Sequence, residues 1–379
     1  MFKGFALVAK WAVKMHALEN KSKVVVAMSG GVDSSVSAGW LKQKGHEVIG
    51  ISLQLHDMAE DVENKFGTCC SLSDISDARR VAEKLNIPFY VTNMEERFQK
   101  AVIDNFVDEY VNGRTPNPCV KCNEKVKFST LMDWALDLGA DYLATGHYAN
   151  IRYNEETQEH ELLKGMDPEK DQSYFLFTLK QQDLARSIFP VGTFRKDEVR
   201  DLARKLELSV AEKPDSQEIC FVQARNYKEF VEKKAAISSI KNGPIVDLTG
   251  KVLGEHSGIH QFTIGQRKGI GIASREPLFA VAIRADKNEV VVGPEEALYQ
   301  KHCTVSHLNW INRRHSQKLQ AKIRYRSKES PVELLPVSDG TAEVYFESPQ
   351  RAVTPGQAIV FYEGEKVVGG GWIDRANRV

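Results

Sequence analysis

Hydrophobic and polar residues follow two periods along the first half of the chain. Runs rich in β-branched residues predict buried strands, and the segments between them place apolar residues every three or four positions, which predicts amphipathic helices. Strands that alternate with helices of this length pair in parallel and build a doubly wound α/β sheet. The strands are expected at 24–28, 47–55, 87–92 and 141–145, and the helices begin near 36, 73, 95 and 119.

Two of the expected helices reveal their buried faces in the sequence. The helix from Glu95 to about Val111 ends at Asn112-Gly113, as a C-cap predicts, and a longer helix follows Cys119. The apolar positions expected on their inner faces are Phe98, Val102, Phe106 and Tyr110 in the first helix, and Phe128, Leu131, Ala135 and Leu138 in the second.

The stretch Ser29-Gly30-Gly31-Val32-Asp33-Ser34-Ser35 lies between the first strand and the first helix. Paired glycines predict a tight turn, and the first helical turn has backbone N–H groups without helical acceptors. These groups, the helix dipole and the serine hydroxyls favour an anion such as phosphate. A plain turn needs fewer glycines and hydroxyls. The Gly-Lys-Ser/Thr of a Walker A loop is absent, so cleavage at the outer phosphates of a nucleotide is not indicated. We call residues 29–35 the phosphate loop.

The segment 114–123 reads RTPNPCVKCN, and its prolines exclude a helix before Cys119. Cys119 and Cys122 would therefore lie at the start of a helix, where the dipole stabilises a thiolate nucleophile or metal ligand. Packing at a loop-to-helix junction is the alternative for both residues. Cys220 has apolar neighbours and is, from its local sequence alone, more typical of a core than of a catalyst.

After residue 148 the pattern of alternating strands and helices gives way to a hairpin, short helices and then turn-rich and β-rich segments. A hairpin or excursion of alternating polarity is expected over 148–163, a helical segment over 174–179 and a helix over 196–206. Turn-rich residues from about 223 to 275 predict a small linker domain, and β-rich runs after it predict a small barrel. The barrel strands are expected at 279–284, 289–292, 319–325, 342–346 and 358–362. The expected units are an extension at 1–22 whose status is open, a first domain at 23–222, a central domain at 223–275 and a barrel at 276–379.

The composition of the chain limits which partners it can bind and in which cellular compartment it is expected. The 379 residues include 51 basic and 51 acidic side chains, so a nucleic-acid surface requires local segregation of charge. Alternation along a strand would place Arg324 and Arg326 on one face, as a phosphate-binding stripe requires, although a solvated face explains them equally well. The spacing of Cys119 and Cys122 favours a reducing compartment, and no apolar run reaches the ~20 residues of a membrane span. The basic residues before Lys23 fit a misassigned start, with Met15 as the alternative, or an organelle transit peptide.

The chain resembles the tRNA-specific 2-thiouridylases (the MnmA/TrmU family), which convert the wobble uridine of certain tRNAs to 2-thiouridine. The resemblance runs from about Lys23 to the end, and its first motif resembles the PP-loop of ATP pyrophosphatases. It implies a PP-loop ATP pyrophosphatase domain, a small central domain that contacts tRNA and a β-barrel that binds tRNA. The motifs are AMSGGVDSS, GTCCS at 67–71, RTPNPCVKCN, ATGHYA at 144–149, KDQSYFL at 170–176, DSQEICF at 215–221, FTIGQRKG at 262–269 and PGQ at 355–357.

The resemblance implies a first step that activates uridine. Its C2 oxygen is a poor leaving group, so it attacks the α-phosphate of ATP, which enters with Mg²⁺, and pyrophosphate leaves. The residues implied for ATP binding are Ala27, Met28, Ser29, Gly30, Gly31, Val32, Asp33, Ser34, Leu53 and Gly146.

For the second step the resemblance implies that Cys220 carries sulfur as a persulfide and that Cys122 frees it, leaving a Cys122–Cys220 disulfide to be reduced. Cys119 departs from the family, which has Asp there as a candidate general acid or base, and a thiol puts that role in doubt. Cys119, Cys122 and Cys220 could instead hold an iron–sulfur cluster that activates sulfide; the persulfide route is favoured. Cys69 and Cys70 belong to the pattern without a derived role.

The resemblance also implies the contacts with tRNA. The wobble base is not paired in the anticodon loop and can be turned outward. His147 fits a structural histidine equally well. The expected partners are tRNA and a persulfide donor, either a cysteine desulfurase or a sulfur-relay protein; the expected state is a monomer in the cytoplasm, or in an organelle if residues 1–22 are a transit peptide. The implied tRNA-binding residues are Asn117, Pro118, Cys119, His147, Lys170, Asp171, Gln172, Arg324, Tyr325 and Gln357.

Two other functions share some of these features. A PP-loop enzyme that adenylates a different substrate, such as an argininosuccinate synthetase or a glutamine-dependent amidotransferase, would have the phosphate loop without needing paired cysteines or a barrel. A non-catalytic RNA-binding protein with a vestigial nucleotide fold is disfavoured because the loop, the cysteines and the tRNA segments are all intact.

Overall fold

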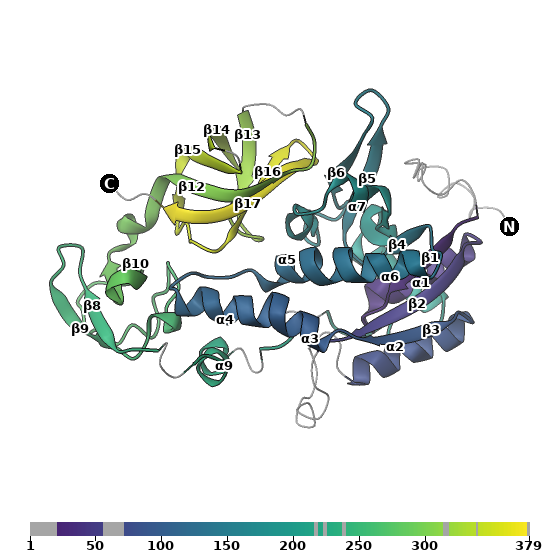
Figure 1. Ribbon diagram of the computed structural model, residues 1–379, viewed down its shortest axis with the longest axis horizontal. Helices are drawn as coiled ribbons and strands as arrows, with labels where there is room; N and C mark the ends of the chain where they lie inside the picture. The colour runs from purple at the N-terminus through teal and green to yellow at the C-terminus, as the bar shows by residue number, and fades with distance from the viewer. Residues whose placement is uncertain are drawn as a thin grey trace.

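The computed structural model describes residues 21–55, 72–215, 219–222, 226–236, 240–313, 318–338 and 340–376, so Cys69 and Cys70 lie outside the described residues. Figure 1 shows a parallel sheet with its helices at one end, a small β unit at the other end and a barrel above. Two long helical rods run across the middle and connect these parts. None of the helices within the described ranges has the length and apolar character needed to cross a membrane.

The first domain is built on a five-stranded parallel sheet in the order β3-β2-β1-β4-β7. Alternate residues of β1 face opposite sides: Val25 packs in one hydrophobic cluster, and Val24 and Val26 pack in another. Both faces are therefore buried, as a doubly wound sheet requires, and the predicted fold class is confirmed. The elements are β1 (Lys23–Ala27), β2 (Glu47–Gln54), β3 (Phe89–Asn93), β4 (Tyr142–Ala144), β7 (Ser187–Ile188), α1 (Val32–Gln43), α2 (Leu72–Leu85), α7 (Gln181–Ala185) and α8 (Lys196–Lys205).

The first long rod consists of α3 (Glu95–Phe98), a π-helical stretch (Gln99–Ile103) and α4 (Asp104–Val111). Its four expected core positions are buried. The rod ends at Gly113, whose φ of +70° suits the left-handed conformation of a helix terminus. A Cβ atom there would lie 2.5 Å from Ile283 Cγ2, so this terminus also packs closely against the central domain.

The second rod consists of α5 (Pro118–Cys122), a π-helical stretch (Asn123–Leu131) and α6 (Met132–Asp137). Phe128, Leu131 and Ala135 are buried as expected, but Leu138 is 38% exposed. Leu138 is the C-cap residue of α6 and lies beyond its last helical residue, Asp137, so the helical period no longer applies to it.

The C-terminal barrel has the strand order β12-β15-β14-β13-β16-β17 and closes through pairing of β12 with β17. The hairpin of the first domain extends this sheet, because Leu162 and Leu163 in β6 pair with Val367 and Lys366 in β17. The strands are β5 (Ala149–Asn154), β6 (Glu159–Lys164), β12 (Tyr299–Trp310), β13 (Lys318–Lys322), β14 (Ser330–Ser338), β15 (Thr341–Arg351), β16 (Ala358–Glu363) and β17 (Lys366–Ala376).

The central domain extends further along the chain than expected. Its sheet has the order β10-β11-β8-β9, so the boundary expected between 275 and 276 cuts through one unit. The strands at 279–284 and 289–292 therefore belong to the central sheet and not to the barrel. The elements are α9 (Tyr227–Lys234), β8 (Gly243–Val246), β9 (Val252–His256), β10 (Phe279–Arg284) and β11 (Glu289–Gly293).

Two further local expectations were wrong. The segment expected to be helical over 174–179 is a short 3₁₀ turn, Ser173–Leu176. The strand expected over 319–325 ends at Lys322, and Arg324 and Arg326 lie in the turn that follows. Strand alternation therefore does not place these two arginines on one face. Further 3₁₀ turns are Pro190–Thr193, Ile259–Gln261, Ala285–Lys287 and Glu295–Leu298.

Candidate functional site

The phosphate loop lies where the strand order reverses, because β2 pairs with one side of β1 and β4 with the other. Ligands of doubly wound sheets bind at this position. Gly30 has a φ of +72°, and a Cβ atom there would lie 2.1 Å from the backbone oxygen of Asp74 in α2. A Cβ atom on Gly146, just after β4, would lie 2.6 Å from the backbone nitrogen of Ser34. Both glycines therefore permit close approach of backbones around the loop.

Serine hydroxyls hold the loop in this shape. Ser34 Oγ accepts a hydrogen bond from Ser29 N (3.2 Å) and donates to Gly31 O (3.2 Å), and Ser35 Oγ also donates to Gly31 O (2.8 Å). Among the described residues, no side-chain hydrogen bond caps the start of α1 at Gly31. The first-turn N–H groups of this 12-residue helix are the groups that would bind the anion expected from the sequence.

The remaining residues expected at the nucleotide lie around this loop. Ala27 ends β1, Met28 and Val32 are buried beneath the turn, and Leu53 lies buried near the carboxyl end of the neighbouring strand β2. The structure therefore brings the ten expected positions to one edge of the sheet.

Asp33, in the first turn of α1, is engaged by residues that the sequence analysis missed. Lys196 Nζ lies 2.7 and 2.9 Å from its two carboxylate oxygens, and Tyr148 donates a hydrogen bond of 2.7 Å. Burial and the nearby Asp33 charge raise the pKa of Tyr148, which keeps it a donor. Lys196 also pairs with Asp215 at 2.7 Å. These residues come from distant parts of the chain, and no short motif joins them.

Lys213, which the sequence analysis also missed, stabilises the turn of the phosphate loop. Lys213 Nζ donates to Gly30 O (3.0 Å) and to Asp74 (2.6 Å) and Asp77 (2.5 Å) of α2. Lys170, which the resemblance assigned to tRNA, pairs with Asp215 at 2.8 Å and so belongs to the same charged network.

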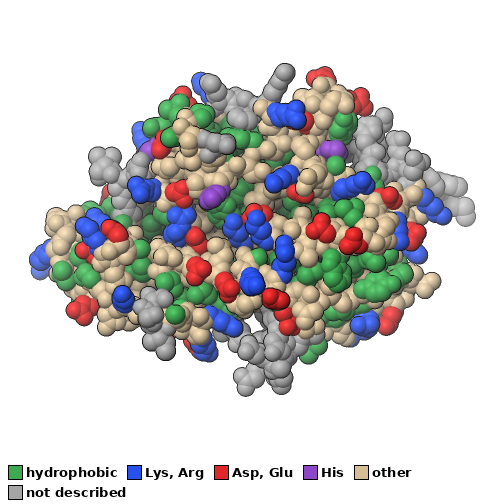
Figure 2. Space-filling model, in the orientation of Figure 1, with side chains coloured by type: hydrophobic (Ala, Val, Ile, Leu, Met, Phe, Trp, Pro, Cys, Tyr) green, Lys and Arg blue, Asp and Glu red, His purple; other side chains and the backbone are tan. Residues whose placement is uncertain are grey.

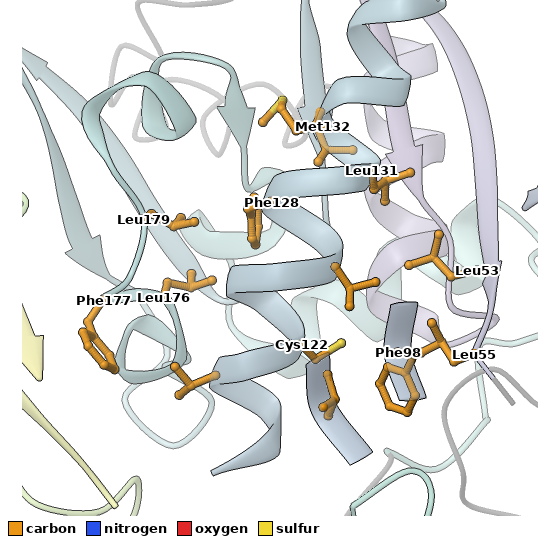
Figure 3. Close-up of a cluster of buried hydrophobic side chains, with 14 of the residues drawn as sticks. Leu53, Leu55, Phe98, Cys122, Phe128, Leu131, Met132, Leu176, Phe177 and Leu179 are labelled. Carbon is orange, nitrogen blue, oxygen red and sulfur yellow. The ribbon is translucent and has the colours of Figure 1, made fainter. Parts of the chain in front are cut away.

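The paired cysteines differ in exposure. Asn117 caps α5 by accepting a hydrogen bond from Val120 N (3.4 Å), so Cys119 lies in the first helical turn and Cys122 at the fifth residue, both near the helix start as expected. Cys119 is exposed, whereas Cys122 is 8% exposed. Figure 3 shows the Cys122 side chain directed towards Phe98, within the core of the first domain.

Cys220 packs against the same core from another part of the chain. The residue after it, Phe221, is in edge-to-face contact with Phe98 (5.7 Å between ring centroids) and Phe106 (5.1 Å), and it packs on Phe230 at 5.2 Å. Phe98 therefore adjoins both cysteine sites.

The three cysteines do not form a metal centre in this conformation. Within the described ranges, which include Cys119, Cys122 and Cys220, no three His, Cys, Asp or Glu side chains are placed to hold a metal ion. The residues therefore do not fit an assembled iron–sulfur cluster as the structure stands.

The barrel contacts the loop before the cysteines. Gln357 Nε2 donates to Thr115 O (3.0 Å) and Pro116 O (3.1 Å), and Thr115 N donates to Pro355 O (2.8 Å). Arg114 reaches Asp374 at 3.3 Å. The amide of Gln357, expected at tRNA, is thus directed at the loop that carries Asn117 and Pro118.

Two other residues expected at tRNA make hydrogen bonds inside the protein. The buried Asp171 accepts from the backbone nitrogens of Gly165 (2.9 Å) and Ser173 (3.1 Å). Gln172 accepts from Tyr148 N at 3.0 Å. Both therefore shape the loop between the hairpin and the 3₁₀ turn Ser173–Leu176.

His147 lies between Phe128 and Phe189, with 6.0 Å between ring centroids in each pair, and Nδ1 is 2.7 Å from Thr145 Oγ1. Burial, and to a lesser degree the charge of Lys127, lowers its pKa well below the ordinary value. A neutral histidine in an aromatic setting fits the structural alternative for this residue.

On the barrel, Arg324 donates to the backbone oxygen of Arg351, and the ring of Tyr325 packs on Phe175 at 4.6 Å. Both therefore lie where the barrel meets the KDQSYFL segment of the first domain. Figure 2 shows Lys and Arg side chains gathered near the middle of the face viewed, between the barrel and the long rods.

A parallel α/β domain with a phosphate loop at its switch point, followed by two β domains, defines a class of nucleotide-binding enzymes. A family model described as the tRNA methyl transferase HUP domain matches residues 22–224. Models described as the tRNA methyl transferase PRC-barrel domain and the aminomethyltransferase beta-barrel domain match residues 228–294 and 300–373.

Curated relatives name the family. The tRNA-specific 2-thiouridylase MnmA of Geotalea uraniireducens is 54% identical over 362 residues, which cover 94% of this chain and 96% of the relative. The protein of the same name from Geobacter metallireducens is 52% identical over 361 residues, covering 94% and 98%. The chain belongs to the tRNA-specific 2-thiouridylase family.

Solved structures are more distant. The NMN synthetase of Francisella tularensis is 16% identical with a TM-score of 0.34, covering 62% of this chain and 86% of that one. A 4-thiouridine synthetase in complex with RNA and ATP is 16% identical with a TM-score of 0.32, covering 56% and 50%. These similarities are too low to carry an argument about this chain.

Proposed function

We propose that this protein catalyses ATP-dependent 2-thiolation of the wobble uridine of tRNA. The observation that carries the proposal is the shaped phosphate loop at the switch point of a chain that matches its family along nearly its whole length. The reaction has two half-reactions, and each uses a different part of the site.

In the first half-reaction, the uridine C2 oxygen attacks the α-phosphorus of ATP and pyrophosphate leaves. The first-turn N–H groups of α1 and the hydroxyls of Ser29 and Ser34 would hold the departing pyrophosphate. Mg²⁺ enters with the nucleotide and keeps most of its ligands from phosphate and water, as this ion prefers. The product is a uridine adenylate whose C2 is open to a nucleophile.

In the second half-reaction, the terminal sulfur of a Cys220 persulfide attacks C2 and AMP leaves with the former C2 oxygen. The Cys122 thiolate then attacks the Cys220 sulfur, which breaks the S–S bond to the transferred sulfur and releases 2-thiouridine. A Cys122–Cys220 disulfide remains, and an external dithiol reduces it. A persulfide donor, either a cysteine desulfurase or a sulfur-relay protein, reloads Cys220.

The role of Cys119 stays open between two proposals. As an exposed thiol next to Asn117 and Pro118, it would contact the target uridine. As a third cluster ligand it would require a different arrangement of the cysteines, because no three His, Cys, Asp or Glu side chains among the described residues are placed to hold a metal ion. Iron and labile-sulfide analysis of protein purified without oxygen separates the two: active enzyme with near-zero iron excludes the cluster.

The tRNA would lie over the basic middle of the face in Figure 2. Asn117, Pro118 and Cys119 would lie next to the base, and Arg324 and Tyr325 would contact the RNA from the barrel. We propose a monomer that acts in the cytoplasm, where a reducing environment supports turnover of the disulfide.

The test uses Cys220→Ser with unmodified tRNA, ATP and a persulfide donor. Thiolated tRNA should disappear, while the first turnover of pyrophosphate release remains, because adenylation does not need the sulfur. The control is Cys303→Ala in the barrel core, which should thiolate normally. Loss of pyrophosphate release in Cys220→Ser would contradict the assigned role. Pyrophosphate release without thiolation in the unaltered protein would favour a PP-loop enzyme with another substrate.

A further inference from the structure

Lys121 lies between Cys119 and Cys122 in the sequence, and its side chain extends from α5 to the barrel. Its ammonium is 4.5 Å from the centre of the Trp372 ring in β17, the strand that passes beside α5 in Figure 1. The ring is buried and packs against Phe177, with 6.0 Å between the ring centroids. A cation over the face of a tryptophan is attracted by the negative charge of that face. The barrel therefore helps to fix the Lys121 side chain.

The barrel also holds the loop just before α5. The amide of Gln357 donates to the backbone oxygens of residues 115 and 116. Lys121 N donates to Asn117 O at 3.4 Å, so Lys121 lies one helical turn after this residue. The ammonium of Lys121 is thus placed where the barrel meets the loop that would hold the target base.

The hydrogen-bonding capacity of this ammonium is mostly unused. It has three N–H donors, and within the described residues its hydrogen-bond acceptor is Glu124 Oε2 at 3.3 Å. The Lys121 side chain is 23% exposed, so a ligand can reach it although most of it is enclosed by protein. Phosphate oxygens are strong acceptors for an ammonium group. The position therefore suits an anion that supplies such oxygens.

Glu124 does not neutralise the charge of this group. Its carboxylate is shared by Lys121 at 3.3 Å and Lys125 at 2.8 Å. Burial opposes ionisation of Glu124, but hydrogen bonds and charges from Lys125 and Lys121 outweigh it and lower the pKa of this carboxyl group. Two cations on one anion leave one positive charge, and Lys121 makes the longer of the two bonds. Lys121 can therefore turn to another anion while Glu124 stays paired with Lys125.

The contacts of Lys121 favour RNA over ATP as the source of the phosphate. The phosphate loop has its own cations, since Lys196 pairs with Asp33 and Lys213 donates to Gly30 O. The neighbours of Lys121 are instead the second rod and the barrel. Turning a base outward costs free energy, and contacts to the phosphates fix the position of the strand that carries it. A cation next to the base-binding loop is suited to hold that strand.

We propose that Lys121 binds a backbone phosphate next to the wobble uridine and so positions the outward-turned nucleotide at the loop that carries Asn117. Lys121 is a positioning residue, because it contacts the RNA backbone and not the reacting atoms. The proposal rests on the proposed function for the identity of the tRNA, and it adds a contact that the resemblance does not assign.

The test is the equilibrium binding of unmodified tRNA to the full-length protein over a range of salt concentrations. Lys121→Met should weaken binding about tenfold, as expected for the loss of one charged hydrogen bond. It should also reduce the slope of log K against log salt by about 0.7, the value for one phosphate contact to a single strand. Lys121→Arg keeps the charge and the contact with the ring, so it should bind like the unaltered protein.

Two further variants separate this contact from general electrostatics. Glu124→Gln removes the acceptor that competes for Lys121, so it should tighten tRNA binding. The matched control is Lys84→Met, which removes the same charge from an ion pair between α2 and Glu207 and should change neither the affinity nor the slope. Circular dichroism and the affinity for ATP with Mg²⁺ verify that each variant is folded.

A change in the RNA identifies the phosphate. The probe is a full-length tRNA with a methylphosphonate in place of one of the two phosphates that flank the wobble uridine, which removes the charge of that group. At the contacted phosphate, this change should weaken binding to the unaltered protein about tenfold, and it should have no further effect on Lys121→Met.

Three results would overturn the contact: an unchanged salt slope in Lys121→Met, additive losses from the variant and both methylphosphonates, or a loss of ATP affinity in Lys121→Met with unchanged tRNA affinity. The last result would assign Lys121 to the nucleotide. A parallel thiolation assay keeps the two proposals apart. Thiolation with equal tRNA affinity in Lys121→Met removes only the phosphate contact, whereas a salt slope that depends on Lys121 in a protein that does not thiolate removes the proposed function.

Discussion

The phosphate loop and the loop before the cysteines are shaped by contacts from different domains. The phosphate loop is held by its own serines, between Ser29 and Ser35, and by residues of the same domain such as Lys213, which donates to Gly30 O. The loop at 114–117 is held by the barrel, through Pro355 and Gln357. A nucleotide site can thus be formed by the first domain, whereas the base-binding loop depends on a domain near the other end of the chain.

The largest effect should come from Gly30→Ala. The new Cβ atom would lie 2.1 Å from Asp74 O, and the residue would keep a φ of +72°, so the loop must shift. A displacement of about 1 Å at a reacting group costs about a hundredfold in rate, and pyrophosphate release should fall by at least this factor.

Gly45→Ala is the matched control for Gly30→Ala. Gly45 has a φ of +90°, but nothing lies within 4 Å of its added Cβ atom. It should therefore lose about 1–2 kcal/mol of stability from backbone strain without losing pyrophosphate release. Equal activity losses in the two variants would show that strain, and not the approach of α2, controls the loop.

The next effect should come from Gln357→Ala. Two hydrogen bonds to the carbonyls of Thr115 and Pro116 are lost, each worth about 1 kcal/mol. We expect kcat for thiolation to fall about tenfold, while the affinity for tRNA changes less. Gln320→Ala, on strand β13 of the same barrel, is the control. Weaker tRNA binding with unchanged kcat would instead establish Gln357 as an RNA contact.

The smallest effect concerns pH. The folded protein holds His147 neutral below its usual pKa of about 6.5, while the unfolded chain takes up a proton. Stability should therefore fall as pH falls below about 6.5, by up to about 1.4 kcal/mol per pH unit from this group. Urea unfolding at pH 7.5, 6 and 5 measures the slope, and His147→Gln should flatten it. An unchanged slope in His147→Gln would assign the acid sensitivity to other groups, such as His46, whose pKa burial also lowers.

The sequence predicted what depends on local pattern. The first domain's strands, the phosphate loop and the buried face of the first rod could be found because period, glycine and capping signals lie within a few residues of one another. Leu138 was misplaced because α6 ends at Asp137 and leaves Leu138 as its C-cap residue. Arg324 and Arg326 were misplaced because the strand ends early in a turn, where Ser327 N donates to Arg324 O.

Pairing between segments that are distant in the chain could not be predicted from the sequence. Strands β10 and β11 alternate like barrel strands, and only the register of Val290 with Ile245 shows that they belong to the central sheet. The same limit applies to the site. The residues of the ATP loop adjoin one another in the chain, but Lys196 and Tyr148 reach Asp33, and Asp215 reaches Lys196, only through the tertiary fold.

The shared sheet of the hairpin and the barrel bears on how the protein is made. Leu163 in β6 leaves the ribosome about 200 residues before Lys366, its partner in β17. The edge of β6 therefore has no native partner strand during more than half of translation. Exposed strand edges of this kind promote aggregation. Nascent chains halted before residue 366 should consequently bind chaperones that released chains do not.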